Sequence, residues 1–253
     1  MLNPYLDSAL VIWLYVTLWF LIAIIKKDNS IVDIAWGLGF VVVAWWQYFY
    51  HPHPYSSILT AVVTLWGVRL GTYLFFRNWS EGEDWRYKQM RENWKGNFAI
   101  NSYFRVFILQ GTVLFVISLV LMQQPDENTF LPSFIFYLGI GIFAIGFLWE
   151  TIADFQLKQF KAKSENKGKF MQSGLWKYSR HPNYFGEMLV WWGIYLFTTT
   201  YGTWYLFFIS PLTITFFLLR VSGIPFLKKK QSKSPKYAKY IEAVPNAILP
   251  KFW

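Results

Sequence analysis

The stretch KYSRHPNYFGEMLVWW, residues 177–192, places cationic, hydroxyl, amide and carboxylate groups directly before an apolar run. Asn183 and Glu187 are four residues apart, so they would share one face of a helix. The free backbone N–H groups of that helix's first turn, with Lys177 and Arg180 nearby, would form an anion site. We therefore expect a polar site at the start of a membrane helix, with the glutamate facing a water-accessible pocket rather than lipid.

A second set of ionisable residues precedes this stretch. Glu150, Asp154 and Lys158 are spaced by four residues, so they would form one stripe on a helix that leaves the membrane. A basic loop, residues 161–182, connects this stripe to the next helix. Charged side chains inside a bilayer are costly unless they pair or face water, so the stripe is a candidate for function.

Three further charges, Asp33, Arg69 and Arg220, lie in other apolar runs. Pairs between helices, such as Arg69 with Asp33 or Glu187 with Arg220, would explain single residues without any function. Six ionisable residues at one depth, on at least five helices, favour instead a polar pocket that opens to the cytoplasm.

The chain of 253 residues is 55% hydrophobic and contains no cysteine, which excludes disulfides, thiolate metal sites and a cysteine nucleophile. About 20 apolar residues span a bilayer as a helix. Seven runs approach that length, namely 8–25, 31–50, 57–76, 103–122, 131–152, 184–200 and 203–221. The last two are separated only by a short turn and predict a helical hairpin. The expected fold is an all-α, seven-transmembrane-helix bundle.

The basic residues are distributed unevenly between the predicted loops. Of the 24 Lys and Arg residues, 21 fall on alternate loops and none on the loops between them. By the positive-inside rule the N-terminus is outside and the C-terminus cytoplasmic. The net charge of +10 therefore reflects topology and anionic lipid rather than nucleic acid.

Other motifs carry less chemical information. The HPHP sequence at 51–54 predicts a rigid turn rather than a metal site, and no dinucleotide or P-loop glycine motif is present. The GVRLG sequence at 67–71 is typical of close helix packing. The charged sequence EGEDWRY at 81–87 fits either an ordered lid or a solvated loop.

Two segments carry a resemblance to a family of known chemistry. GLWKYSRHPNYFGEMLVWWG, residues 174–193, and the tail at 236–253 resemble the C-terminal domain of steroid 5α-reductases, and the His-Pro-Asn-Tyr and Gly-Glu pattern is also similar to isoprenylcysteine carboxyl methyltransferases. The segments 29–40, 65–78 and 82–87 resemble uncharacterised bacterial membrane proteins that carry the same C-terminal domain. We accordingly divide a single membrane domain into helices 1–130 on the substrate side and a part 131–253 on the cofactor side.

The resemblance implies a seven-helix membrane fold that binds NADPH in a cytoplasmic cavity and reduces an enone in a steroid or similar lipid. It implies that the cofactor contacts are Asn183, Glu187, Asp154, Arg220 and Glu150, with Tyr178, Arg180 and Lys158 near the phosphates. Glu150 stands where the reductases have an asparagine. Asp33 and Tyr73, which are assigned only by helix number and residue type, could polarise the substrate carbonyl.

Three functions remain open at this point. The first is an NADPH-dependent reductase of a lipophilic substrate in a bacterial inner membrane, with no metal and no nucleic-acid partner. The second is an S-adenosylmethionine-dependent methyltransferase of a lipid, although the basic sequence FLKKKQSKS at 226–234 lacks the acidic residues that those enzymes carry there. The third is a non-enzymatic lipid-binding membrane protein.

Overall fold

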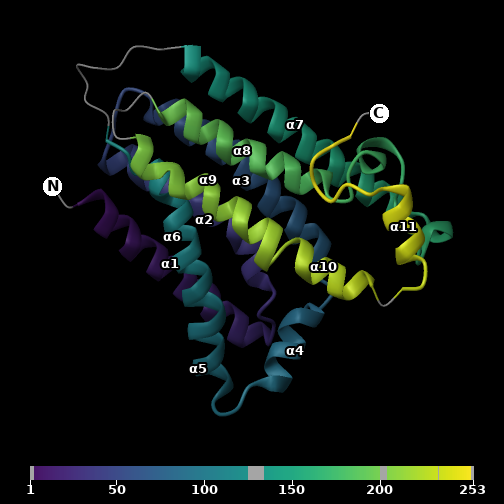
Figure 1. Cartoon of the computed structure of the whole chain (residues 1–253). Helices are drawn as coiled ribbons and strands as arrows, with labels where there is room; N and C mark the ends of the chain where they lie inside the picture. The colour runs from purple at the N-terminus through teal and green to yellow at the C-terminus, as the bar shows by residue number, and fades with distance from the viewer. Residues whose placement is uncertain (1–2, 125–133, 200–203, 233, 252–253) are drawn as a thin grey trace. The chain divides into compact units, whose positions relative to one another are not determined.

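The computed structural model describes residues 3–124, 134–199, 204–232 and 234–251, and within these ranges all regular structure is helical (Figure 1). The chain divides into two compact units, residues 1–130 and 131–253. The substrate and cofactor sides that the sequence analysis assigned to these two parts stay predictions. We describe each unit by itself.

The first unit consists of three long helices, the short helix α4, and a fourth long run, Phe98–Leu121, that is interrupted by a π-helical turn and ends in a 3-10 turn. Its elements are α1 (Pro4–Lys26), α2 (Ile31–Tyr50), α3 (Ser56–Asn78), α4 (Trp85–Asn93), α5 (Phe98–Ser102), a π-helical turn (Tyr103–Ile108), α6 (Leu109–Ser118) and a 3-10 turn (Leu119–Leu121). Asn3 caps α1 by accepting a hydrogen bond from the Tyr5 N–H at 2.9 Å, and α1 ends at Lys27 in the left-handed conformation. Both ends follow ordinary capping chemistry.

Helices α2 and α3 touch backbone to backbone. A Cβ added to Gly67 would lie 2.5 Å from the Gly37 carbonyl oxygen, and one added to Gly71 would lie 2.8 Å from Leu38. Only glycine leaves room for this approach. The prediction that GVRLG packs helices is therefore confirmed.

The second unit is built on a close pair of antiparallel helices. Its elements are α7 (Phe134–Ala162), 3-10 turns at Ser164–Asn166, Gly174–Lys177 and Trp204–Phe208, α8 (Pro182–Thr198), α9 (Ile209–Phe216), a π-helical turn (Phe217–Val221), α10 (Ile224–Gln231) and α11 (Tyr237–Ala243). Figure 1 shows α8 running alongside α7 in the opposite direction.

Two glycines on each helix set the contact between α7 and α8. A Cβ on Gly146 would lie 2.7 Å from the Gly186 carbonyl oxygen, and one on Gly139 would lie 2.8 Å from that of Gly193. Gly139 and Gly146 are seven residues apart, as are Gly186 and Gly193. The glycines therefore meet as two matched pairs across the antiparallel helices.

Six helices in the described ranges are long and apolar enough to cross a membrane. They are Pro4–Lys26, Ile31–Tyr50, Ser56–Asn78, Phe98–Leu121, Phe134–Ala162 and Tyr205–Lys229. The remaining predicted span, 184–200, corresponds to α8, whose 17 residues would measure about 26 Å. That is somewhat short of the ~30 Å hydrocarbon core. The turn predicted between the last two spans lies outside the described residues. The chain is thus a multipass membrane protein.

Candidate functional site

A group of polar side chains in the second unit lies where α7 and α8 cross. Glu150 and Asp154 on α7 are 2% and 4% exposed, and Glu187 on α8 is 9% exposed. The Asn183 Nδ2–H donates to the Asp154 Oδ1 at 3.2 Å, which joins the two helices. The sequence predicted these four residues as one site, and the structure brings them to one end of the helix pair.

The glycine contact fixes the level of the carboxylates on the two helices. A Cβ on Gly186 would lie 2.6 Å from the Glu150 backbone nitrogen and 2.7 Å from the Glu150 Cβ. Glu187, the next residue along α8, therefore lies at the level of Glu150. One turn after Glu150 on α7, Asp154 lies opposite Asn183, which comes one turn before Glu187 on α8.

The loop before α8 is attached to α7 by two hydrogen bonds. The Trp176 Nε1–H donates to the Ala153 carbonyl at 3.0 Å, and the Leu175 N–H donates to the Gln156 Oε1 at 2.9 Å. Gly174 adopts a φ of 59° next to Gln156, a conformation that favours glycine. The loop therefore reaches α8 along the surface of α7.

The C-terminal segment, residues 237–251, covers the same loop. The Arg180 N–H donates to the Asn246 carbonyl at 2.9 Å, and the Lys251 N–H donates to the Tyr178 carbonyl at 3.2 Å. The Ser179 hydroxyl donates to the Ala247 carbonyl at 3.2 Å. Three consecutive loop residues are thus each bonded to the C-terminal segment.

Arg180 makes the strongest of these contacts. Its Nη1 donates to the carbonyls of Val244 and Pro245 at 3.0 and 2.9 Å, and its Nε is buried without a hydrogen-bond partner. Hydrogen bonds from a charged group are about twice as strong as neutral ones. Arg180, predicted to bind phosphate, uses its Nη1 to hold the C-terminal segment.

An aromatic cluster anchors the C-terminal segment from its other side. The Phe170 ring stacks on Tyr240 with centroids 4.8 Å apart, and Tyr237 lies 5.7 Å from the same ring. Val244 is buried beside them. Burial raises the pKa of Tyr240 to about 12, so this tyrosine stays neutral under ordinary conditions.

His181 lies buried between the loop and the helix. Its ring stacks on Tyr184 with centroids 5.4 Å apart. Burial, together with the charge of Arg180, lowers the pKa of His181 to about 4. The imidazole is therefore neutral near pH 7 and contributes packing rather than charge.

The other predicted cofactor residues are exposed or half-buried. Lys158 is exposed one turn beyond Asp154 on α7. Tyr178 is half-buried, and the Lys177 ammonium lies 4.7 Å from its ring centroid. Arg220 is exposed on the π-helical turn after α9. These cations remain available to an anionic ligand, in contrast to Arg180.

Asp33, the predicted catalytic residue of the first unit, belongs to a different network. The Arg86 Nη2 donates to one of its carboxylate oxygens at 2.6 Å and the Tyr87 hydroxyl donates to the other at 2.8 Å. Asp84 accepts from the Arg86 Nε at 2.8 Å. Burial and the Asp33 charge raise the pKa of Tyr87 well above its usual range. The Asp33 carboxylate thus serves as an anchor for α4.

The segment before α4 is also ordered. The Asn29 N–H donates to the Glu83 carboxylate at 2.9 Å, and the Arg91 Nη2 donates to the same carboxylate at 2.8 Å. The Asp84 N–H donates to the Ser30 hydroxyl at 3.2 Å. EGEDWRY therefore forms an ordered loop and the first turn of α4, held against the start of α2. A role as a lid over a polar pocket stays a prediction.

Tyr73, the other predicted catalytic residue, lies near the end of α3. It is half-buried, and the Arg77 guanidinium lies 5.3 Å from its ring centroid. Its partner in the predicted pair, Asp33, is engaged by α4. The catalytic role of either residue stays a prediction.

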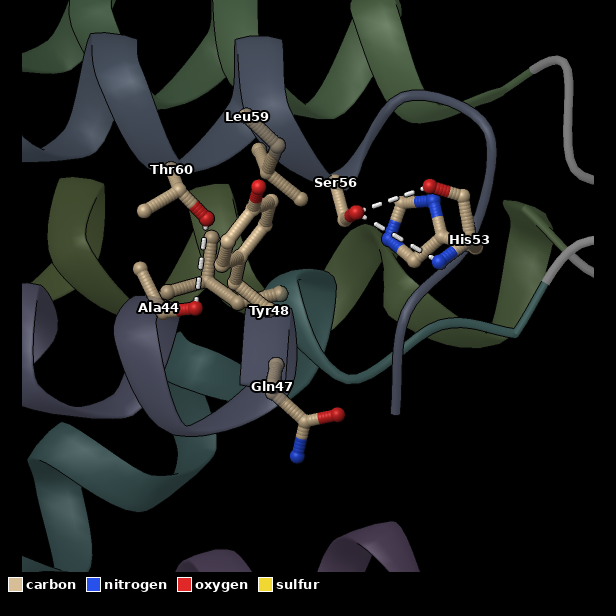
Figure 2. A pocket seen from close by; sticks show the side chains of 8 residues that line it. Ala44, Gln47, Tyr48, His53, Ser56, Leu59 and Thr60 are labelled. Atoms are coloured by element: carbon tan, nitrogen blue, oxygen red, sulfur yellow. Dashed lines mark hydrogen bonds between the residues drawn. The ribbon is translucent and has the colours of Figure 1, made fainter. Parts of the chain in front are cut away.

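A shallow crevice, with no room for a bound molecule, lies between the end of α2 and the start of α3 (Figure 2). Its lining includes Gln47, Tyr48 and His53, and its edge is fixed by the Ser56 hydroxyl, which donates to the His53 carbonyl at 2.8 Å. Burial lowers the pKa of His53 to about 4. No predicted site residue lines this crevice.

Comparison with known proteins identifies the family. Residues 19–244 match a family described as protein of unknown function, DUF1295. The chain belongs to this family. Its membership agrees with the resemblance of residues 29–87 to uncharacterised membrane proteins. The reductase chemistry of the C-terminal resemblance stays a prediction.

Two relatives come from the yeast Schizosaccharomyces pombe. The chain is 25% identical over 234 residues to the uncharacterized protein C594.04c and 26% identical over 118 residues to the uncharacterized protein C7D4.09c. The alignments cover 77% and 47% of this chain but only 64% and 42% of those proteins. No solved structure matches the chain.

The sequence analysis did not predict two structural features of this DUF1295 protein. The glycines at 139, 146, 186 and 193 position the carboxylates, and their shared spacing of seven residues was the available signal. The hydrogen bonds from the loop to the C-terminal segment end on backbone carbonyls. Backbone acceptors leave no side-chain pattern in a sequence.

Proposed function

We propose that this protein is a membrane-embedded, NADPH-dependent reductase of a carbon–carbon double bond conjugated to a carbonyl in a lipophilic substrate. The observation that carries the proposal is the group of three buried carboxylates and one amide, Glu150, Asp154, Glu187 and Asn183, at the crossing of α7 and α8. Ionisable side chains within membrane helices are rare and usually pair or line a water-accessible path, so three carboxylates on one helix pair favour a functional site.

The chemistry of this group fits part of NADPH. Carboxylates accept hydrogen bonds from ribose hydroxyls and from the nicotinamide amide, and Asn183 can donate or accept. The phosphates need cations, which Lys158, Lys177 and Arg220 can supply from exposed positions. When bound, NADPH supplies a hydride. The chain's own residues would hold and orient the ribose and nicotinamide, and they would exclude water from the helix crossing.

The second candidate is an S-adenosylmethionine-dependent methyltransferase. It is favoured by two observations, the excess of buried acids over buried bases at the helix crossing and the use of Arg180 by the C-terminal segment. S-adenosylmethionine carries a ribose diol and a cationic amine but no phosphates, so it suits carboxylates better than a dinucleotide does. The two candidates therefore differ in the ligand charge that the site accepts.

The orientation is part of the same proposal. We place the N-terminus outside and the C-terminus in the cytoplasm, with α8 completing a seventh crossing, because 21 of the 24 basic residues fall on alternate loops. Snorkelling side chains or a locally thinned bilayer would accommodate the 17 residues of α8. Because both yeast relatives are eukaryotic, a bacterial inner membrane stays a prediction from resemblance alone.

The test is a thermal-shift titration of the full chain in detergent with NADPH, NADH and S-adenosylhomocysteine. A ligand at 100 times its Kd stabilises the folded protein by about 2.7 kcal/mol. We expect NADPH to raise the Tm of the native chain and of Glu165→Gln, an exposed control in the same unit, but not of Glu187→Gln. A shift with S-adenosylhomocysteine alone would move the assignment to methyl transfer. No shift with any ligand would overturn both and favour a non-enzymatic lipid-binding protein.

A further inference from the structure

The sequence directly after the last apolar helix is strongly basic. Residues 224–251 contain seven lysines and a single acidic residue, Glu242. Six of these lysines fall within residues 228–239. A cluster of four to eight basic residues immediately after a membrane span is the usual sequence signature of contact with anionic lipid headgroups.

The structure places these charges at the end of a span. The apolar helix Tyr205–Lys229 ends within α10, so its last lysines lie where the chain leaves the hydrocarbon region. Five residues connect α10 to α11 and can extend at most about 18 Å. The lysines of α11 therefore stay close to the same membrane surface.

Four lysines with described side chains are exposed and carry no ion pair within the described part of the chain. This lysine cluster consists of Lys228, Lys229, Lys236 and Lys239. On α11 the opposite side is occupied, because Tyr237 and Tyr240 are buried in the aromatic cluster with Phe170. The burial of the tyrosines turns the lysines outward, and their charges remain free for an external partner.

We infer that the lysine cluster binds the headgroups of anionic lipids. An ammonium group is strongly hydrated and acts as a point charge, which suits a mobile layer of phosphates. The contact also concerns the candidate site, because the same C-terminal segment bonds Tyr178, Ser179 and Arg180. Anionic lipid would hold this segment down on the loop before α8. The inference depends on the membrane spans and not on the proposed reaction.

The experiment uses the absence of native cysteine. The substitution Ala238→Cys, at an exposed position between two lysines of the cluster, introduces a single cysteine. A fluorophore is attached to it in the full chain, which is reconstituted in lipid nanodiscs. Quenching by spin-labelled phosphatidylcholine then reports how often the segment lies on the membrane. Each lysine near an anionic surface contributes about fivefold in affinity. We expect the ratio of membrane-bound to free segment to rise at least tenfold when 30% phosphatidylglycerol replaces phosphatidylcholine.

Two variants separate this contact from general electrostatics. Replacing the four lysines of the cluster by glutamine should reduce the response to less than twofold. A control neutralises four exposed lysines in the last turn of α7 and the loop after it, namely Lys161, Lys163, Lys167 and Lys169, and should keep the response. Raising NaCl from 50 to 500 mM should reverse the bound state in the native chain, because salt screens exposed charges.

Three outcomes would overturn the inference. The first is no dependence on phosphatidylglycerol, and the second is an equal loss in both glutamine variants. The third is capture of the lysine cluster by NADPH in pure phosphatidylcholine, which would assign these lysines to the cofactor phosphates. A failure of NADPH to bind at all, with the lipid response intact, would overturn the proposed function and leave this inference standing.

Discussion

Gly186→Ala tests whether the contact between α7 and α8 builds the site. The added Cβ would lie 2.6 Å from the Glu150 backbone nitrogen, and ordinary contact begins near 3.4 Å, so the helices must separate locally by about 0.8 Å. Overpacking of this kind costs about 1–3 kcal/mol. Alanine recovers up to about 1 kcal/mol through its higher helix propensity. The expected net destabilisation is therefore about 1–2 kcal/mol, close to tenfold in the unfolding equilibrium.

The chain supplies a matched control on the partner helix. A Cβ at Gly141 of α7 would meet nothing within 4 Å, so Gly141→Ala should leave stability unchanged or raise it slightly. Reversible unfolding of both variants in mixed micelles with dodecyl sulfate gives the two free energies. Ligand titration then asks whether the separation of Glu150 from Glu187 weakens binding in Gly186→Ala alone. Equal stability of the two variants, within 0.5 kcal/mol, would refute the contact as we describe it.

Three other predictions concern the loops that surround the helices. Asp33→Asn should weaken the attachment of α4 by about 1–3 kcal/mol and Tyr87→Phe by about 1 kcal/mol, because each removes a hydrogen bond between α4 and the half-buried Asp33 carboxylate. Faster hydrogen exchange over residues 79–93 would show this loss, and unchanged exchange with lost activity would mean that Asp33 is catalytic instead. Arg180→Gln should release the C-terminal segment and speed tryptic cleavage within it at least tenfold. Arg180→Lys should be intermediate, because lysine keeps the charge but lacks the planar guanidinium. Equal cleavage rates in the native chain and both variants would contradict the role given to the guanidinium. The folded chain should be most stable above pH 6.5 and lose up to about 3 kcal/mol of stability as the pH falls toward 4. Unfolding exposes His181 and restores its ordinary pKa near 6.5, so the unfolded chain binds a proton that the buried ring does not bind. Unfolding free energies across this pH range should depend less on pH in His181→Asn, and an unchanged slope would assign the dependence to another group.

The sequence predicted the features that depend on local spacing. The apolar runs predicted the long helices, and four-residue spacing predicted that Glu150 shares a helix face with Asp154 and Asn183 with Glu187. In the structure a hydrogen bond from Asn183 to Asp154 joins the two pairs. The close approach of α2 and α3 followed from small residues four apart. Each of these inferences needs only the geometry of one helix.

Features that depend on distant segments could not be predicted in this way. Arg86 lies 53 residues from Asp33, and their contact requires the fold of the loop between α3 and α4. Arg180 resembled a phosphate ligand because its neighbours are basic and aromatic, whereas its partners are carbonyls 64 and 65 residues away. The predicted span 184–200 was drawn two residues past the end of α8, because hydropathy does not mark where a helix stops.

The bonds between the loop before α8 and residues 244–251 also bear on the order in which the protein is made. Helices α7 and α8 are synthesised and can enter the membrane as a pair before residues 244–251 exist. The loop that begins the candidate site lacks its backbone partners until those residues have been made, because Tyr178, Ser179 and Arg180 bond to them. Segments generally fold as they emerge, with the N-terminal parts first. Membrane insertion and anchoring of this loop are therefore separate events in time, and a nascent chain that already crosses the bilayer would still have an unanchored loop before α8.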